Sequence, residues 1–305
     1  MTRPAALVAV IVSSMSFATL AVLARLAYDA GAEPLPLLAW RFAVAAALMG
    51  VFLLFRHPGA LREGARDIRS YALLSLTGYG AASIAFFFAL THASASVVAI
   101  ILYTYPAMVS AAALVFRREH PSVVRLLALA LTFGGCGVVA LSAADGTATE
   151  PLGVALALVA AVGYAAFTML SEPLMHRQRR LVVMTYTFGM SAVLAGLVTV
   201  ASGGSLSPTG WAPAIWILLG AIVVLPTLVA VFLYLQGIRG LGAAQAAIAS
   251  TAEPAFTVVL AVVFLAERPG GWYALGALLI VAGILVDAWW GSSTDAGRLT
   301  SSPVP

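Results

Sequence analysis

Ten long apolar segments constrain the fold of this 305-residue chain more than any motif does. A helix needs about 20 mostly apolar residues to cross a hydrocarbon layer of roughly 30 Å, and each segment is close to that length. Charged residues, Gly or Pro mark their ends. The segments span residues 4–27, 34–55, 70–91, 94–116, 121–143, 151–173, 181–201, 211–237, 243–266 and 269–290. We therefore predict an all-α integral membrane protein with ten transmembrane helices.

The composition leaves little material for a soluble domain and excludes several kinds of chemistry. Hydrophobic residues make up 62% of the chain and charged residues 9%, against about 25% charged in a typical soluble domain. No lysine is present, which excludes a Walker-type phosphate loop, a Schiff-base lysine and a Ser–Lys dyad. One cysteine and four scattered histidines give neither an intrachain disulfide nor a recognisable zinc site. We expect no metal and no other cofactor.

Arginine collects on one side of the predicted membrane domain. With the N-terminus inside, twelve arginines lie in cytoplasmic segments: Arg3, Arg56, Arg62, Arg66, Arg69, Arg117, Arg118, Arg177, Arg179, Arg180, Arg239 and Arg298. The opposite side holds Arg25 and Arg268. This bias predicts that both termini lie in the cytoplasm. We expect the chain to reside in the cytoplasmic (inner) membrane of a bacterium. Since the arginines record orientation, the net charge of +4 does not indicate a nucleic-acid partner.

The chain repeats itself at an offset of 148 residues. The pairs made equivalent by this shift include Pro106 with Pro254, Glu119 with Glu267, Gly135 with Gly283, and Gly78 with Pro226. A shift of 146 pairs Phe42 with Phe188. We predict two five-helix repeats, residues 1–143 and 151–290, joined by a linker at 144–150. Residues 291–305, rich in Ser, Thr, Gly and Pro, are predicted to form a disordered cytoplasmic tail.

The two repeats are predicted to have inverted topology. Five spans are an odd number, so the second repeat must start on the opposite side of the membrane from the first. The loop charges agree, because four arginines follow the second span whereas its counterpart, residues 201–210, has no charge. Inverted repeats are typical of secondary transporters, whose substrate site lies near the midplane between the halves. A duplicated scaffold with some other activity is the alternative.

Short motifs along the chain resemble those of the EamA family in the drug/metabolite transporter superfamily. They are Trp40-Arg41-Phe42, Tyr105-Pro106, Arg118-Glu119, Gly134-Gly135-Cys136-Gly137, Glu253-Pro254-Ala255-Phe256, Glu267-Arg268, and Gly276 with Gly283. The resemblance covers about residues 5–142 and 151–288. It implies a ten-helix basket with a central cavity that exports amino acids or small metabolites by alternating access. Phe17 departs from the pattern, since tryptophan is frequent at that position in the family.

Two charged residues are predicted to lie deep within spans, Arg41 and Glu253. A charge at the bilayer centre costs about 2.5–3.5 kcal/mol on insertion scales, so each needs a partner or a wet cavity. Arg41 is a candidate to hold a substrate carboxylate, and Glu253 a candidate to accept a proton or a substrate ammonium. A purely structural role, such as locking helix packing, is the alternative for both. Whether the two side chains pair directly is left open.

Tyrosines, one serine and predicted helix breaks complete the set of candidate site residues. A tyrosine combines an apolar ring with a hydroxyl group, which suits an amphipathic ligand. The further candidate substrate-binding residues are Tyr79, Tyr103, Tyr105, Tyr164 and Ser250. Proline inside a helix frees a backbone carbonyl and kinks the chain, and glycine weakens a helix. The predicted hinges or helix breaks are Gly78, Pro106, Pro226 and Pro254.

These observations predict a secondary transporter that exports small organic metabolites, with aromatic or apolar amino acids as the leading substrates. Uptake or exchange of another metabolite or drug-like compound is the alternative. An intramembrane enzyme is disfavoured because no histidine follows Ser191 to act as its base. A channel is disfavoured because no charged ring or filter-like loop is present. We expect a small-molecule substrate and membrane lipid as partners. Proton coupling and the oligomeric state are left open.

Overall fold

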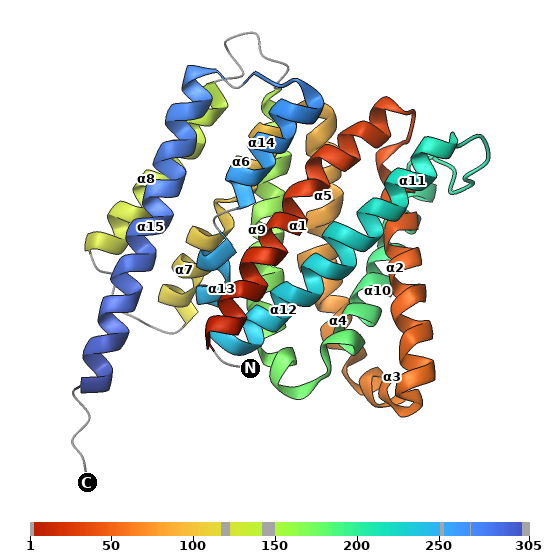
Figure 1. Ribbon diagram of the computed structural model, residues 1–305, viewed down its shortest axis with the longest axis horizontal. Coiled ribbons are helices and arrows are strands. Elements are labelled where there is room, and N and C mark those ends of the chain that lie inside the picture. Colours follow the sequence, from red (N-terminus) through yellow and green to blue (C-terminus); the bar gives the residue numbers. More distant parts are fainter. Residues whose placement is uncertain (1–2, 117–122, 142–149, 251–252, 269, 301–305) are drawn as a thin grey trace.

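The computed structural model describes residues 3–116, 123–141, 150–250, 253–268 and 270–300, and every regular element in these ranges is a helix (Figure 1). Lipid offers no hydrogen bonds to a backbone, whereas a helix satisfies its N–H and C=O groups internally. This is why apolar segments of membrane length fold as helices, as the sequence predicted.

Six helical segments in the described ranges are long and apolar enough to cross a membrane. Four are α1 (Arg3–Asp29), α2 (Pro34–Arg56), α9 (Pro151–Arg177) and α10 (Arg180–Ala201). The fifth, Pro58–His92, joins α3 (Pro58–Gly64), η1 (Ala65–Asp67), α4 (Ile68–Leu73), η2 (Leu74–Gly78) and α5 (Tyr79–His92). The sixth, Pro213–Leu241, joins α11 (Pro213–Ile222), η4 (Val223–Val229) and α12 (Ala230–Leu241).

Shorter apolar stretches occupy the other four predicted spans. The span 94–116 is divided into α6 (Ala95–Leu102) and α7 (Tyr105–Phe116), and the span 243–266 into α13 (Ala243–Ala249) and α14 (Glu253–Leu265). The remaining two are α8 (Val123–Leu141) and α15 (Gly271–Thr300). Helix α15 includes residues 291–300, which we expected in a disordered tail. No proline lies between Gly271, the first residue of α15, and Pro303, so none ends the helix earlier.

Two of the long segments contain a π-helical stretch at equivalent places. The stretch η2 ends at Gly78, and η4 contains Pro226. Proline has no N–H to donate, so a regular helix cannot pass through Pro226 with all its hydrogen bonds intact. Inserted π turns of this kind are frequent at functional sites. Both stretches face the interior, because Gly78 and Pro226 are buried.

Pro106 and Pro254 begin helices instead of kinking them. Each is the second residue of its helix, α7 or α14. Proline suits the first turn of a helix, where its missing N–H would have had no partner. The break between α6 and α7 accordingly falls at Tyr103 and Thr104, just before the helix that contains Pro106. The sequence left open a hinge or a helix break at these two prolines, and the structure has the start of a helix at each.

The helices pair between the two parts of the chain. Helix α1 contacts α12, α2 contacts α10, α5 contacts α9, α6 contacts α14, and α8 contacts α15 (Figure 1). In every pair, one helix comes from residues 1–143 and the other from residues 151–290. At the contact of α2 and α10, the rings of Phe42 and Phe188 are stacked with centroids 6.0 Å apart.

The contact of α8 and α15 depends on two glycines. A Cβ atom at Gly135 would lie 2.8 Å from the backbone oxygen of Gly276. One at Gly283 would clash with the side chain of Thr132 and lie 2.6 Å from the backbone oxygen of Ala128. By contrast, a Cβ atom at Gly134 would meet nothing within 4 Å. Small residues at such positions let helix backbones approach closely.

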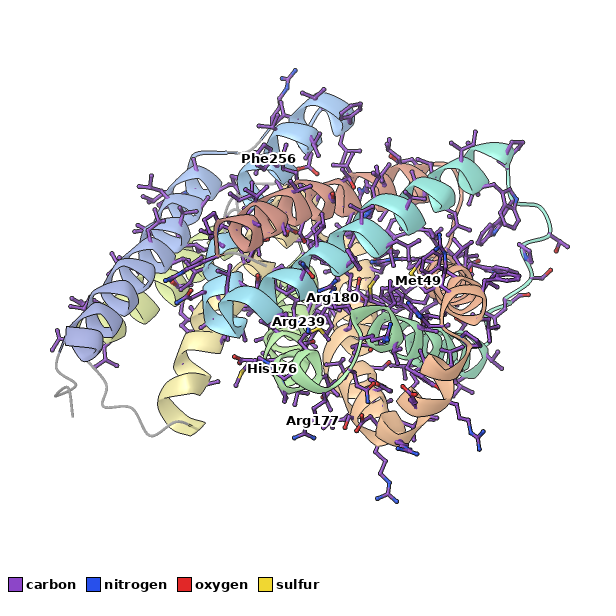
Figure 2. All side chains as sticks on the ribbon, turned by 60° about the horizontal axis from the view of Figure 1, so that its bottom comes forward. Met49, His176, Arg177, Arg180, Arg239 and Phe256 are labelled. Atoms are coloured by element: carbon purple, nitrogen blue, oxygen red, sulfur yellow. The ribbon has the colours of Figure 1, made fainter. Side chains whose placement is uncertain are left out.

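One end of the bundle gathers the start of α1 and the ends of α9, α12 and α15 (Figure 1). His176 and Arg177 lie at this end, in the last turn of α9 (Figure 2). At the opposite end, Glu267 accepts hydrogen bonds from the backbone N–H groups of Ala95 (2.7 Å) and Ser96 (3.1 Å). The carboxylate thereby caps the first turn of α6 and ties it to the segment that follows α14.

Candidate functional site

Arg41 is a fully buried cation on α2. Its Nε donates a hydrogen bond to Thr227 Oγ1 at 2.7 Å, and its Nη2 donates one to Tyr79 Oη at 3.0 Å. The guanidinium also lies 5.0 Å from the ring centroid of Phe42 and 5.5 Å from that of Phe87. Its Nη1 has no hydrogen-bond partner. Because a guanidinium carries five N–H donors, the site retains unused donor capacity.

The partner Thr227 owes its position to the neighbouring proline. Pro226 cannot donate to the carbonyl of Ile222, four residues earlier. The hydroxyl group of Thr227 donates to that carbonyl instead, at 2.7 Å. The same hydroxyl oxygen accepts the hydrogen bond from Arg41. The π-helical stretch η4 thus presents a polar group to a buried arginine without leaving a backbone carbonyl unsatisfied.

The sequence analysis missed Thr227, although a signal for it was present. The shift of 148 residues that defines the repeat places Tyr79 on Thr227. The two hydrogen-bond partners of Arg41 are therefore equivalent positions of the two halves. Applying the offset to each candidate residue would have found this contact.

Glu253 is the first residue of α14 and is 9% exposed. Its Oε2 accepts a short hydrogen bond from the hydroxyl group of Tyr103. Thr257, one turn further along α14, donates its hydroxyl hydrogen to the backbone oxygen of Glu253 at 3.1 Å. Within the described part of the chain, Glu253 and Arg41 form neither an ion pair nor a hydrogen bond with each other. The direct pairing that the sequence left open is thus absent from this conformation.

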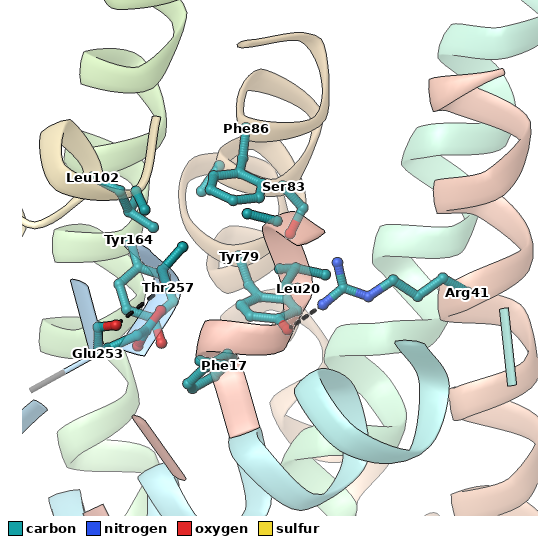
Figure 3. Close-up of a pocket in the computed structure, with 13 residues that line it drawn as sticks. Phe17, Leu20, Arg41, Tyr79, Ser83, Phe86, Leu102, Tyr164, Glu253 and Thr257 are labelled. Carbon is teal, nitrogen blue, oxygen red and sulfur yellow. Dashed lines mark hydrogen bonds between the residues drawn. The ribbon is translucent and has the colours of Figure 1, made fainter. Parts of the chain in front are cut away.

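Arg41 and Glu253 line one common pocket from different sides (Figure 3). The remaining lining is mostly apolar and consists of Phe17, Leu20, Ala21, Tyr79, Ala82, Ser83, Phe86, Ala99, Leu102, Tyr164 and Thr257. The pocket has a volume of about 40 Å³. That space holds a few water molecules. A larger ligand therefore requires the pocket to widen.

The predicted tyrosines fall into two groups. Tyr79 and Tyr164 line the pocket, and Tyr103 binds the Glu253 carboxylate. Tyr105 and Ser250 lie outside the lining and hydrogen-bond to each other. All of these side chains except Tyr164 are almost fully buried. The site residues predicted from sequence are therefore near one another, but only part of the set faces the pocket.

A cluster of aromatic rings adjoins the pocket, and its centre, Tyr234, was not predicted. The hydroxyl group of Tyr234 lies 3.2 Å from that of Tyr105 and 3.1 Å from Thr168 Oγ1. The ring of Tyr164 lies between the pocket and this cluster, with centroids 4.8 Å from Tyr105 and 5.9 Å from Tyr234. Phe17, on α1, contacts both Tyr164 and Tyr234 edge to face. The cluster closes the pocket on that side.

Outside the pocket, the described ranges contain one imidazole–carboxylate pair, His92 with Glu150 at 2.7 Å. No group of three or more His, Cys, Asp or Glu residues there has an arrangement that could hold a metal ion. The described pocket therefore offers a ligand hydrogen bonds and charged groups. It contains one arginine, one carboxylate and several hydroxyl groups around an apolar space.

Comparisons with known proteins match this architecture. The EamA-like transporter family matches residues 4–141 and 151–287. The "Uncharacterized transporter YcbK" of Bacillus subtilis (strain 168) is 27% identical over 267 residues, which covers 85% of each chain. The "Uncharacterized transporter YwfM" of the same organism is 30% identical over 164 residues, covering 52% of this chain and 53% of the relative. A solved crystal structure, 21% identical, superposes with a TM-score of 0.67 over 99% of this chain and 100% of its own.

Apolar helices of membrane length, with a pocket among them that holds two charged residues, define a multi-pass membrane protein. Because the family match covers most of the sequence, the chain belongs to the EamA-like transporter family. It is a membrane transporter. This confirms the resemblance seen in the sequence motifs.

Proposed function

We propose that this protein is a secondary transporter that exports small organic metabolites, with amino acids bearing aromatic or apolar side chains as its leading substrates. The observation that carries the proposal is the unused Nη1 of Arg41 in a pocket that also contains the Glu253 carboxylate. A guanidinium binds a carboxylate well. A carboxylate attracts an ammonium group. A zwitterion bound between Arg41 and Glu253 would satisfy both charges.

The apolar lining supports a substrate with an apolar side chain. Phe17, Leu20, Phe86 and Leu102 surround the space between the two charged residues (Figure 3). Ligand sites are commonly lined by apolar and aromatic side chains, with a few polar groups that fix the orientation of the ligand. A strongly anionic substrate fits this site less well, because Arg41 is the single arginine in the described lining.

Alternating access by two inverted five-helix repeats is the proposed mechanism. The double family match and the pairing of helices between residues 1–143 and 151–290 support two related halves. The narrow pocket supports a conformation that opens only when the halves move. We propose ten transmembrane helices with both termini in the bacterial cytoplasm, since arginine is concentrated in the loops on that side.

Transport of radiolabelled amino acids by proteoliposomes tests the proposal. Vesicles that contain the purified full-length chain are loaded with unlabelled phenylalanine or leucine, and entry of the labelled amino acid is followed. We expect saturable exchange that exceeds the rate in protein-free vesicles. Glutamate serves as the anionic comparison and should exchange poorly. Absence of exchange for every amino acid would overturn the substrate assignment. Flux that does not saturate would favour a channel over a carrier.

The direction of transport requires a second measurement. Vesicles are preloaded with labelled substrate, and its release is followed with and without an imposed pH gradient. The export hypothesis predicts release faster than from protein-free vesicles. Release at the protein-free rate, despite exchange in the first assay, would favour uptake or exchange of metabolites as the physiological activity.

A further inference from the structure

A basic hollow lies where α10 begins and α12 ends, and an apolar groove lies between the first turns of α10 and of α12. The basic hollow has a volume of about 300 Å³ and is lined by Arg180, Gln236, Arg239 and Gly240. The apolar groove has a volume of about 250 Å³ and is lined by Met49, Leu181, Met184, Leu228, Val229, Phe232 and Leu233. Figure 2 shows Arg180 and Arg239 close together, with Met49 further along the bundle. Neither space belongs to the pocket around Arg41.

The hollow and the groove are continuous along the same helix faces. On α12 and the end of η4, residues Val229, Phe232, Gln236 and Arg239 are spaced three or four apart, so they share one face. On α10, Arg180 in the hollow lies one turn from Met184 in the groove. The guanidinium of Arg180 also lies 4.9 Å from the ring centroid of Phe232. Arg180 therefore borders both spaces.

The positive charge of the hollow is not neutralised within the described part of the chain. Neither Arg180 nor Arg239 forms an ion pair with any residue there. The Nε atom of Arg180 is buried and has no hydrogen-bond partner. An anion in the hollow would supply both the missing hydrogen bond and the missing charge.

We propose that the basic hollow and the apolar groove together bind an anionic phospholipid. The phosphate lies between Arg180 and Arg239, and one acyl chain follows the groove. Arg180 is the first residue of α10, and Arg239 lies in the last turn of α12. Because both helices belong to candidate membrane spans, their ends lie at the depth of the lipid headgroups. Phe232 stands seven residues before Arg239, about 10 Å further toward the membrane interior. A polar end at the membrane surface and an apolar path inward match the shape of a lipid.

Two features favour this ligand over others of related chemistry. A free phosphate or a soluble metabolite would use the arginines but gain nothing from the apolar groove. A zwitterionic lipid would bring an ammonium group close to two arginines, which repel it. Basic pockets between transmembrane helices at a membrane surface are suited to anionic headgroups. The site is independent of the proposed amino-acid substrate, because none of its residues lines the pocket around Arg41.

Native mass spectrometry of the delipidated full-length protein in detergent tests the proposal. Phosphatidylglycerol and phosphatidylcholine with identical acyl chains are added in separate experiments. We expect retention of one phosphatidylglycerol and little phosphatidylcholine. The Arg180→Gln and Arg239→Gln variants should each weaken phosphatidylglycerol binding about fivefold, and the double variant more. Arg177→Gln is the matched control, since it removes an exposed charge outside the hollow and should leave binding unchanged.

A second pair of variants tests the groove. Val229→Trp places a large side chain in the groove and should weaken lipid binding, whereas Val224→Trp, on an exposed part of η4 outside the groove, should not. Equal retention of both lipids by the unmodified protein would overturn the proposal without depending on any variant. Full phosphatidylglycerol binding by the double arginine variant would also overturn it. Displacement of the lipid by inorganic phosphate at matched concentration would show a free-anion site instead.

Discussion

Arg41 combines complete burial with two neutral hydrogen-bond partners. A buried charge is expensive unless it is paired. Thr227 and Tyr79 hold the guanidinium in place, but neither supplies negative charge. Tyr103 similarly holds Glu253 without neutralising it. Each charged group is thus oriented by hydroxyl groups that do not neutralise it, which supports the proposal that the site binds a zwitterion.

Replacing Arg41 tests its proposed role in holding a carboxylate. We expect Arg41→Gln to lower kcat/KM for amino-acid exchange at least tenfold, because a hydrogen bond to a charged group contributes about 1.5–3 kcal/mol. Arg56→Gln, at the exposed end of the same helix, is the control and should retain normal exchange. Normal kcat/KM in the Arg41→Gln variant would assign Arg41 a packing role.

Glu253 is the candidate for proton coupling. The hydroxyl group of Tyr103 donates a hydrogen bond to its carboxylate. Tyr79, Tyr164 and Arg41 line the same pocket. We expect the Glu253→Gln variant to lose the pH dependence of transport across the neutral range, because an amide cannot exchange a proton there. Exchange rates measured in vesicles at a series of pH values check this. The exposed Glu63→Gln variant is the control. A pH profile unchanged in Glu253→Gln would exclude the proton role.

At the scale of the elements, interruptions of helices supply the polar groups of the site. The π-helical stretch η4 presents Thr227, and the break between α6 and α7 presents Tyr103. Glu253 is the first residue of α14. Irregular backbone is tolerated at membrane depth where it lines a cavity. In η4 the cost in backbone hydrogen bonding is offset by the hydroxyl group of Thr227, which donates to the carbonyl of Ile222.

Replacing Pro226, the proline of η4, should affect the thermal stability and the transport kinetics in opposite directions. We expect Pro226→Ala to leave the Tm unchanged or raise it, because alanine can donate the backbone hydrogen bond that proline cannot. The regular helix that results would turn Thr227 away from Arg41, and KM for the substrate should rise about five- to tenfold. Thermal unfolding in detergent and exchange kinetics measure the two effects. Pro213→Ala, at the start of α11, is the control. A large loss of Tm with normal KM would contradict this explanation.

The glycines of the α8–α15 contact allow a matched test of packing. Gly135→Ala should lower the stability by about 1–3 kcal/mol, because its Cβ would press on the backbone of Gly276. Gly134→Ala adds the same group where nothing lies within 4 Å, so it should be neutral or slightly stabilising. Thermal unfolding of the two variants in the same detergent compares them directly. Equal Tm values would mean that α8 and α15 are free to separate.

At the scale of the whole molecule, each helix of the first part of the chain is covered by one from the second. The equivalent residues Phe42 and Phe188 stack on each other, and the equivalent residues Tyr79 and Thr227 bind the same arginine. A two-fold relation between the halves would produce both observations. The pocket lies at the centre of this arrangement, where a movement of one half against the other would open it.

Accessibility labelling tests the proposed topology. In a chain carrying Cys136→Ala, single cysteines are introduced at Arg62, Arg177 and Ser205, and a membrane-impermeant thiol reagent is applied to intact cells and to inverted vesicles. We expect Arg62→Cys and Arg177→Cys to react only in inverted vesicles, and Ser205→Cys only in intact cells. Finding the first two on opposite faces would refute the inverted five-helix repeats.

The candidate site was predictable in part. Arg41 and Glu253 were found because a charge within an apolar span is unusual, and both line the pocket. Thr227 and Tyr234 were missed, since a hydroxyl group in a span is common and its partner lies far away in the sequence. Tyr105 and Ser250 were assigned to the substrate, yet they bind each other outside the pocket. Residue type identified the candidates, but it did not identify their partners.

The sequence by itself determined that this chain forms membrane helices and belongs to its family. Segment length and hydropathy suffice for the first, because lipid forces each span to satisfy its own backbone. Only the tertiary structure decided that Arg41 binds Thr227 and Tyr79 and that Glu253 binds Tyr103. Those contacts depend on the lateral order and rotation of the helices. Packing between distant segments sets both, and no local pattern in the sequence records them.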